Sequence, residues 1–241
     1  MRILPLPSTA ALVAALVLAG CGGSSGGSGS TAQGTTTAAA TTTAAATTTA
    51  AAKPAGLLAG IPQKGTDLGR AGAPALMIEF ADLQCPFCGE WARATFPHVV
   101  EKYVRTGKLR LVWRGLAFLG PDSEKALRAV DAAGVQDRLW DMVEGLFARQ
   151  GGENSGWVTD ELVREVAGSI PGLDVDKLMR DRASAAVDAT IQTAEKDAKD
   201  AGVKGTPTFF AGRPPGQLHQ LQLSSLAPAA FDAALDAALA Q

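Results

Sequence analysis

The chain has 241 residues, of which 46% are hydrophobic and 19% are charged, and its formal net charge is −2. This composition is typical of a globular protein, and the small net charge does not point to nucleic acid or an anionic membrane surface as a partner. Three cysteines and two histidines supply few ligands for a structural metal site.

Residues 1–20 are predicted to be a secretory signal peptide. Arg2 supplies a positive charge, and the apolar stretch over residues 10–18 is too short to span a bilayer. The stretch ends in Leu18-Ala19-Gly20-Cys21, which resembles the signal box of bacterial lipoproteins. That resemblance implies cleavage before Cys21 and a lipid on its sulfur, which also explains the odd cysteine count. The alternative is an ordinary signal peptide followed by a spare cysteine.

Residues 21–54 are predicted to form a flexible tether. Gly and Ser dominate its first part, and three Thr-Thr-Thr-Ala-Ala-Ala blocks occupy residues 35–52. No charged, aromatic or large aliphatic residue occurs over residues 22–52, so nothing can be buried to offset the entropy cost of ordering. A tether of this length has an end-to-end distance of about 30 Å, which would hold a domain clear of a lipid surface.

A folded domain is predicted over residues 55–241, beginning with a turn-rich lead-in that has room for one edge strand. The apolar run 75–80 predicts a short buried strand, and residues 86–106 predict an amphipathic helix kinked at Pro97. Residues 108–114 predict the next strand. Strand, helix and strand within about forty residues favour two parallel strands joined by a crossover.

Two cysteines flank the junction between this first strand and the helix, in Cys85-Pro86-Phe87-Cys88. Pro86 suits the first helical position, where its missing N–H costs nothing. Cys85 would then lie at the helix N-terminus, where free N–H groups and the dipole favour a thiolate nucleophile. Cys88, one turn later, would be the resolving thiol.

Two other readings of the pair of cysteines remain open. One is a purely structural disulfide, and the other is half of a zinc site. Structural zinc normally takes four ligands, and Cys21, His98 and His219 have no paired spacing that would complete the set.

Residues 121–201 have a helical period throughout. Their hydrophobic stripes are interpreted as core. The predicted helices are 123–133, capped by Asp122 or Ser123, then 137–149, 159–169, and one or two helices over 174–201.

The C-terminal part predicts a hairpin and a last helix. A loop over residues 202–207 leads into a strand over 208–211, and a second arm is predicted over 219–223. A final helix over 226–240 is expected to cover one face of the sheet.

The two cysteines, combined with the downstream stretch Gly205-Thr206-Pro207-Thr208, resemble the DsbA-like thiol–disulfide oxidoreductases of the thioredoxin superfamily. The resemblance covers roughly residues 57–241. It implies an α/β thioredoxin fold, with a helical domain of about residues 121–201 inserted between the βαβ and ββα halves. It also implies a cis Thr206-Pro207 bond facing the dithiol, with Pro207 shaping the substrate groove and Thr206 binding an extended peptide.

Glu79 is the third residue that the resemblance singles out. It lies six positions before Cys85, where thioredoxin-family members often have a buried acid. A buried carboxyl has a raised pKa and can accept the proton of the resolving thiol. The alternative is a surface residue on a half-exposed strand. Asp82 is predicted to be an exposed turn residue, and neither His98 nor His219 has a partner in the sequence.

The resemblance implies an extracytoplasmic enzyme, lipid-anchored through Cys21, that exchanges a Cys85–Cys88 disulfide with cysteines of exported proteins. Oxidation is the favoured direction. Phe87 replaces the histidine common in strongly oxidising relatives, so a reductase or isomerase is the first alternative. No metal or organic cofactor and no nucleic acid is expected. A membrane redox partner would reoxidise the dithiol, and the lipid anchor would make the only membrane contact.

Two further alternatives are not disulfide oxidoreductases. Cys85 and Cys88 could be soft ligands of a copper-handling protein. Such a site usually adds a His or Met, and Met77 lies on the first strand at an orientation that the sequence leaves open. The chain could also be a binding module whose dithiol is vestigial.

Overall fold

The computed structural model describes residues 56–240, which fall within one compact unit. The predicted signal peptide (1–20), the lipidation site Cys21 and the tether (21–54) lie outside the described residues. Among the described residues, no helix is long and apolar enough to cross a bilayer.

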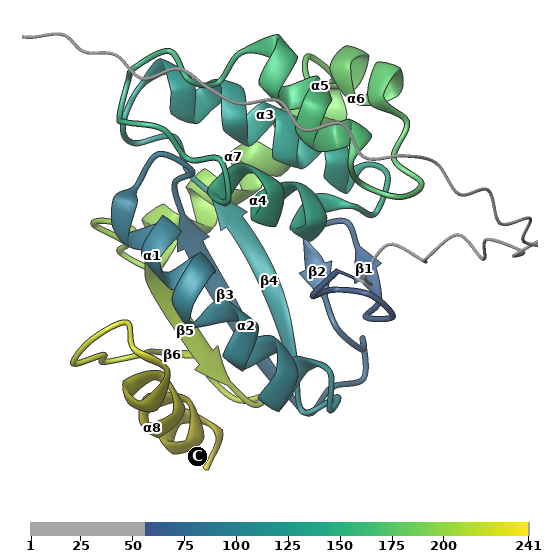
Figure 1. Ribbon diagram of the computed structural model, residues 1–241. Coiled ribbons are helices and arrows are strands. Elements are labelled where there is room, and N and C mark those ends of the chain that lie inside the picture. Colours follow the sequence, from purple (N-terminus) through teal and green to yellow (C-terminus); the bar gives the residue numbers. More distant parts are fainter. Residues whose placement is uncertain (1–55, 241) are drawn as a thin grey trace, which may run out of the picture. The chain divides into compact units, whose positions relative to one another are not determined.

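A six-stranded mixed sheet forms the centre of the unit (Figure 1). Its strands follow the order β1-β2-β4-β3-β5-β6, where β3 and β4 are parallel and β5 is antiparallel to β3. The βαβ unit followed by an antiparallel strand confirms the predicted thioredoxin arrangement. The strands are β1 (Gln63–Lys64), β2 (Asp67–Leu68), β3 (Ala75–Ala81), β4 (Leu109–Gly115), β5 (Thr208–Gly212) and β6 (His219–Gln220).

The two edges of the sheet differ from the prediction. The lead-in contains a hairpin of two short strands, β1 and β2, instead of one edge strand, and β2 pairs with β4. At the other edge, β6 is only two residues long where five were predicted. The strands at both edges are only two residues long, and a hydrophobic pattern cannot predict where such short strands begin and end.

The helix predicted over 86–106 is broken into three pieces: α1 (Pro86–Ala94), α2 (Phe96–Val99) and a π-helical turn, η1 (Val100–Val104). The break falls at Thr95, two residues before Pro97. A proline lacks the N–H that would bond the carbonyl four residues earlier, and its ring clashes with that carbonyl, so the helix ends before it.

The remaining helices lie within the predicted helical segment 121–201, except the last one, which matches the final helix predicted over 226–240. They are α3 (Pro121–Gly134), α4 (Leu139–Phe147), α5 (Asp160–Gly168), α6 (Val175–Asp181), α7 (Ala185–Asp200) and α8 (Pro228–Leu239). The predicted cap of the first one is wrong. Gly120 precedes α3 with φ at 121°, and Pro121 is its first residue, so Asp122 and Ser123 lie inside the first turn.

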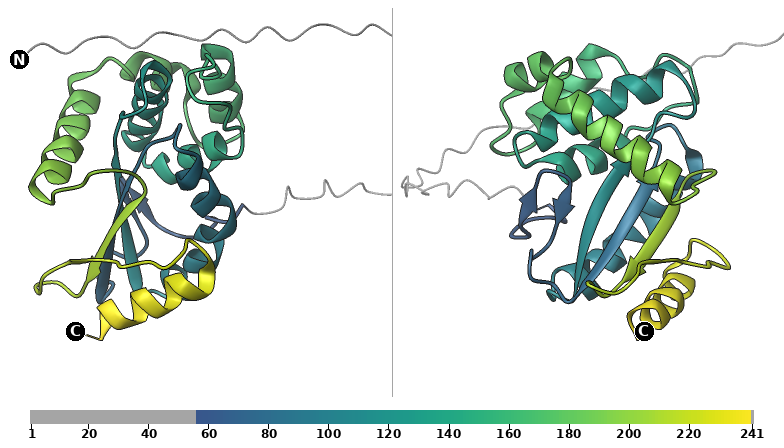
Figure 2. Two further views of the ribbon diagram at one scale, coloured as in Figure 1. Left: turned by 90° about the vertical axis from the view of Figure 1, so that its left-hand side faces the viewer. Right: turned by 180° about the vertical axis from the view of Figure 1, so that it is seen from behind.

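Helices cover both faces of the sheet. Along β3 the side chains alternate, so Met77, Glu79 and Ala81 face α1 and α2, which lie in front of the sheet in Figure 1. On the opposite face Phe80 packs with Ala194 of α7, which crosses that face in the right-hand view of Figure 2. The last helix of the predicted insertion therefore covers the sheet itself.

Candidate active site

The two cysteines lie at the predicted junction between β3 and α1. Cys85 is the N-cap residue of α1 in an extended conformation, and Pro86 follows at the first helical position. Both are free thiols, and Cys88 is completely buried. Cys85 is 5% exposed as a residue, yet it lines a surface cavity of about 410 Å³. An approaching molecule can therefore reach Cys85 and not Cys88.

The fold brings the Thr206-Pro207 loop next to Cys85, although the two are 121 residues apart in sequence. The Thr206-Pro207 bond is cis, and the Cys85 Sγ lies 3.2 Å from the Thr206 carbonyl oxygen, to which the protonated form of Cys85 donates. A second cis bond, Pro214-Pro215, lies in the loop after β5 and was not predicted. The structure thus joins the two motifs on which the family resemblance depended.

The environment of Cys85 lowers its pKa from 9.0 to about 6. The largest cause is a hydrogen bond from the Cys88 thiol, with smaller contributions from the Thr206 hydroxyl and from the Cys88 and Phe87 backbone N–H groups; partial burial opposes them. The backbone N–H groups at the helix end, which were predicted to favour a thiolate, contribute less than the Cys88 thiol. At neutral pH Cys85 is mainly a thiolate.

The environment of Cys88 has the opposite effect. Burial raises its pKa far above the ordinary value, and the negative charges of Cys85 and Glu79 raise it further. The two sulfurs therefore differ in role by environment, because one is stabilised as an anion and the other is held neutral.

Glu79 is buried at 1% exposure, so the buried alternative of the two is the one observed. Neither of its carboxyl oxygens has a hydrogen-bond partner among the described residues. Burial, and then the charge of Glu144, raise the pKa of Glu79 well above its ordinary value. Burial therefore favours the protonated form of Glu79, which lies close enough to Cys88 for its ionisation to affect that thiol.

The prediction that Asp82 is an exposed turn residue is wrong, because Asp82 is completely buried. Its carboxylate accepts hydrogen bonds from Gln84 N (2.8 Å), Ser123 Oγ (2.7 Å), Phe118 N (2.7 Å) and Leu119 N (3.1 Å). Four donors compensate the cost of burying the charge. Three of them lie more than 35 residues away in the sequence, so local sequence gave no sign of them.

Sequence reasoning also missed two amide side chains that fix the loop before α1. Gln150 donates from Nε2 to the carbonyls of Leu83 (2.9 Å) and Cys85 (3.0 Å). Gln84 donates to Ser123 Oγ, and its own Oε1 accepts from the backbone N of Asn154 at 2.6 Å. These bonds connect the Cys85 loop to the inserted helices. The only sequence signal for these amide side chains is that Gln84 directly precedes Cys85.

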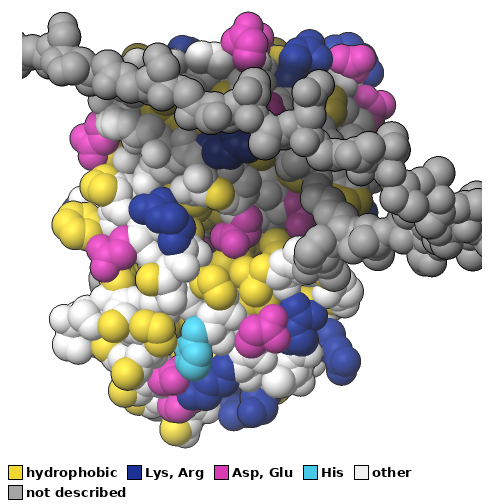
Figure 3. All heavy atoms as spheres, viewed as in Figure 1, with side chains coloured by type: hydrophobic (Ala, Val, Ile, Leu, Met, Phe, Trp, Pro, Cys, Tyr) yellow, Lys and Arg dark blue, Asp and Glu magenta, His cyan; other side chains and the backbone are white. Residues whose placement is uncertain are grey.

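Two cavities flank the exposed side of Cys85 and share Phe87 and Thr206 in their walls. The first, about 380 Å³, is also lined by Pro207, Phe209 and the segment 220–226. The second, about 410 Å³, includes Phe118 and Leu119. Phe87 and Phe118 are 60% and 53% exposed, and hydrophobic side chains gather on this side of the molecule, around the start of α1 (Figure 3). The surface around Cys85 is therefore concave and partly apolar.

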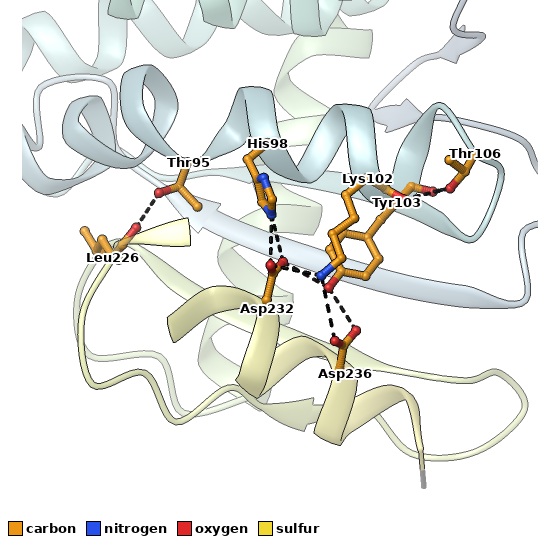
Figure 4. A network of polar contacts seen from close by, with 8 residues as sticks. All are labelled: Thr95, His98, Lys102, Tyr103, Thr106, Leu226, Asp232 and Asp236. Carbon is orange, nitrogen blue, oxygen red and sulfur yellow. Dashed lines mark hydrogen bonds and ion pairs between the residues drawn. The ribbon is translucent and has the colours of Figure 1, made fainter. Parts of the chain in front are cut away.

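A network of polar contacts holds α8 against α2 and thereby fixes one wall of the first cavity (Figure 4). Thr95 Oγ1 donates to the Leu226 carbonyl, and Asp232 of α8 pairs with His98 Nε2 and with Lys102 Nζ, each at 2.9 Å. His98 thus has a partner that the sequence did not reveal, and the contact is remote from the dithiol chemistry.

The candidate copper ligands can also be located. Met77 is completely buried on β3, on the face covered by α1. Within residues 56–240, no group of three or more His, Cys, Asp or Glu is placed to hold a metal ion.

The fold and the dithiol at the start of a helix define a thioredoxin-fold protein with an inserted helical domain, as in the DsbA-like branch. The thioredoxin family model matches residues 63–226, more than half of the chain. The chain belongs to the thioredoxin family.

Several known proteins are similar to this chain. The probable disulfide bond formation protein D of Bacillus anthracis is 27% identical over 146 residues, which is 59% of this chain and 67% of that one. Oxidised BdbD from Bacillus subtilis superposes with a TM-score of 0.63 at 20% identity, covering 75% of this chain and 98% of that one. Wolbachia pipientis alpha-DsbA1 superposes with a TM-score of 0.61 at 21% identity, covering 72% of this chain and 89% of that one.

Proposed function

We propose that the protein is an extracytoplasmic thiol–disulfide oxidoreductase that oxidises cysteine pairs of exported proteins with its Cys85–Cys88 disulfide. The observation that carries this proposal is the Cys85 sulfur, stabilised as a thiolate and placed 3.2 Å from the cis-proline loop at Thr206. The name of the Bacillus anthracis relative, a probable disulfide bond formation protein, supports it.

The first chemical step consumes the enzyme disulfide. A client thiolate attacks the Cys85 sulfur, the Cys85–Cys88 bond breaks, and a mixed disulfide between Cys85 and the client forms. Cys88 leaves with the electron pair and takes up a proton, because its pKa in the buried site is far above neutral. Glu79, whose protonated form is favoured by burial and which lies near Cys88, is the proposed donor of that proton.

The second step releases the product. A second client thiolate attacks the client sulfur of the mixed disulfide, and Cys85 leaves as a thiolate. Two electrons have then passed from the client to the enzyme. A pKa of about 6 makes Cys85 a good leaving group at neutral pH, which favours the oxidising direction.

Substrate binding would use the groove beside the dithiol. The backbone of Thr206 borders both cavities, and an extended client segment could bond to it as an added strand. Pro207 would shape the floor of the first cavity, and exposed Phe87 would contact apolar client side chains. We infer no organic cofactor, metal or nucleic acid in this reaction.

Anchoring and reoxidation complete the proposal. The Leu18-Ala19-Gly20-Cys21 sequence supports a lipid on Cys21, with residues 22–54 as a tether to a bacterial membrane. A membrane redox partner would remove the two electrons from the reduced dithiol. The alternative is a reductase or isomerase of the same fold, for which Phe87, without a hydrogen-bonding group, is the supporting feature.

Oxidation of a reduced two-cysteine peptide by the oxidised chain tests the proposal. We expect one peptide disulfide per wild-type chain, none with Cys85→Ala, and full activity with Cys21→Ser in solution. Cys88→Ala should accumulate a mixed disulfide through Cys85 when it is mixed with the oxidised peptide. Peptide oxidation by the Cys85→Ala variant would contradict the proposal.

A further inference from the structure

The proposed reaction requires a proton to reach a sulfur that has no contact with solvent. Cys88 is completely buried, and its neighbour Glu79 is only 1% exposed. After Glu79 has given its proton to the Cys88 thiolate, it must be reprotonated before the next cycle. The route from solvent to Glu79 is therefore part of the chemistry, and this inference rests on the proposed function.

Glu79 lies below α1 between two aromatic residues of neighbouring strands. In register it is paired with Trp113 of β4 on one side and Phe209 of β5 on the other, so the three side chains share one face of the sheet. Trp91 of α1 covers Phe209, with ring centroids 4.9 Å apart. Aromatic rings therefore flank Glu79 on both neighbouring strands, and Trp91 adds a ring on the α1 side.

Helix α4 spans the gap between β4 and α1 on that same face. Near its start, Trp140 packs edge-on against Trp113 with centroids 5.9 Å apart. At its last residue, the Phe147 carbonyl accepts a hydrogen bond of 2.9 Å from Arg93 of α1. Glu144 lies four residues after Trp140 and therefore on the same side of the helix. From this spacing we infer that its side chain faces the space between β4 and α1, on the same face of the sheet as Glu79.

Glu144 is half-buried, so it has access both to the interior and to water. Its charge affects Glu79, as the second cause of the raised pKa of that residue after burial. None of the described ion pairs between residues 56 and 240 involves Glu144. A half-buried carboxyl without a cation partner is able to gain and lose a proton, whereas one held in an ion pair stays ionised.

We propose that Glu144 is the outer carboxyl of a two-carboxyl relay that carries protons between solvent and Glu79, and through Glu79 to the Cys88 sulfur. During reduction of the disulfide, Glu79 gives its proton to the Cys88 thiolate and takes one from Glu144 through a bridging water, because the two carboxyls share no direct hydrogen bond. Glu144 then takes a proton from solvent. During reoxidation the Cys88 proton leaves through the same two groups in reverse. No electrons pass through the carboxyls.

The charged groups around Glu144 set the pH range of the relay. Burial, followed by the charge of Asp141 one turn earlier, raises the pKa of Glu144 to about 8. From α1, Arg93 faces α4 and bonds to the Phe147 carbonyl. From α5, Glu165 faces α4 and pairs with Arg149 at 2.8 Å.

Helix α3 also packs against α4, and its buried acid is Asp131. The charges that act on Asp131 are those of Arg114 and Arg128, and Asp131 is not among the groups that shift the pKa of Glu144. Glu144 therefore exchanges protons near neutral pH, where the enzyme would work.

The test is single-turnover reduction of the oxidised chain by dithiothreitol, followed by tryptophan fluorescence between pH 6 and 9. This readout needs no client protein. Glu144→Gln should slow the reduction by about tenfold. Loss of a general acid that touches the reacting sulfur slows a reaction by roughly 10²-fold or more, whereas Glu144 acts only through Glu79. It should also remove the inflection near pH 8 and increase the solvent deuterium isotope effect. Glu161→Gln, an exposed acid on α5, should behave as wild type.

A double-mutant cycle separates the relay from a structural effect. In a Glu79→Gln background, Glu144→Gln should cause no further slowing, because the two groups act in series. The relay would be overturned if the double variant were slowed by the product of the two single-variant factors, or if Glu144→Gln kept the wild-type rate and pH profile. If the wild-type chain is reduced normally but never oxidises a peptide, the proposed function fails while the relay stands.

Discussion

The Thr206 hydroxyl is the contact that most directly links the cis-proline loop to the reactivity of Cys85. Replacing it by Thr206→Val keeps the shape of the side chain and removes the donor to the thiolate. A hydrogen bond to a charged group contributes about 1.5–3 kcal/mol, and one pKa unit corresponds to about 1.4 kcal/mol. Because the sulfur borders a cavity open to water, we expect the lower end of that range. The pKa of Cys85 should rise from about 6 to about 7.

Ultraviolet absorbance of the thiolate as a function of pH measures this change. Cys21→Ser in every variant leaves only two thiols, and Cys88 does not ionise in the range concerned because of its burial. The reduction potential should fall by about 30 mV, since the reduced form loses the same stabilisation. Thr208→Val is the matched control, because its hydroxyl bonds to the Gly205 carbonyl instead. An unchanged Cys85 pKa in Thr206→Val would refute the assigned hydrogen bond.

Three further predictions concern other groups. Alkylation of the reduced Cys21→Ser chain by iodoacetamide should increase through about pH 6 and modify Cys85 alone; equal labelling of Cys88 would contradict the assigned burial. Burial raises the pKa of Asp131 from 3.8 to about 7, so the folded state binds more protons between these values and stability falls as pH rises through them. In urea unfolding at pH 8, the free energy of unfolding of Asp131→Asn should therefore exceed that of wild type by up to about 4 kcal/mol, and at pH 4 the two should be equal. An equal gain at both pH values would refute the raised pKa. Asp82→Asn turns an amide N–H toward buried donors and should lower the free energy of unfolding by about 3 kcal/mol in the same assay. The same substitution at the exposed Asp176 should change it very little, and equal effects at the two positions would contradict the buried network.

The sequence predicts well those features of this fold that depend on short-range pattern. The apolar run before Cys85 identifies β3, and Pro86 marks the start of α1, because hydrophobic period and proline geometry act within a few residues. The break before Pro97 is predicted for the same reason. Edge strands such as β6 are poorly predicted, because their pairing depends on the neighbouring strand and not on their own pattern.

The chemistry of the site is less predictable, because it depends on contacts between distant parts of the chain. The burial of Asp82 follows from donors on the segment 118–123, and the main stabilisation of the Cys85 thiolate comes from the position of one sulfur relative to another. Spacing indicated that Cys88 could reach Cys85. It did not indicate that the Cys88 thiol would outweigh the helix end.

The reduction potential of the Cys85–Cys88 couple, measured against glutathione, tests the central claim most directly. Thioredoxin has a nucleophile pKa of about 7 and a potential of about −270 mV. The pKa of Cys85, about 6, is one unit lower, which corresponds to about 30 mV. The account therefore predicts a potential of about −240 mV or more oxidising. A value at or below about −270 mV would show that the thiolate is not stabilised as described and would favour a reductase.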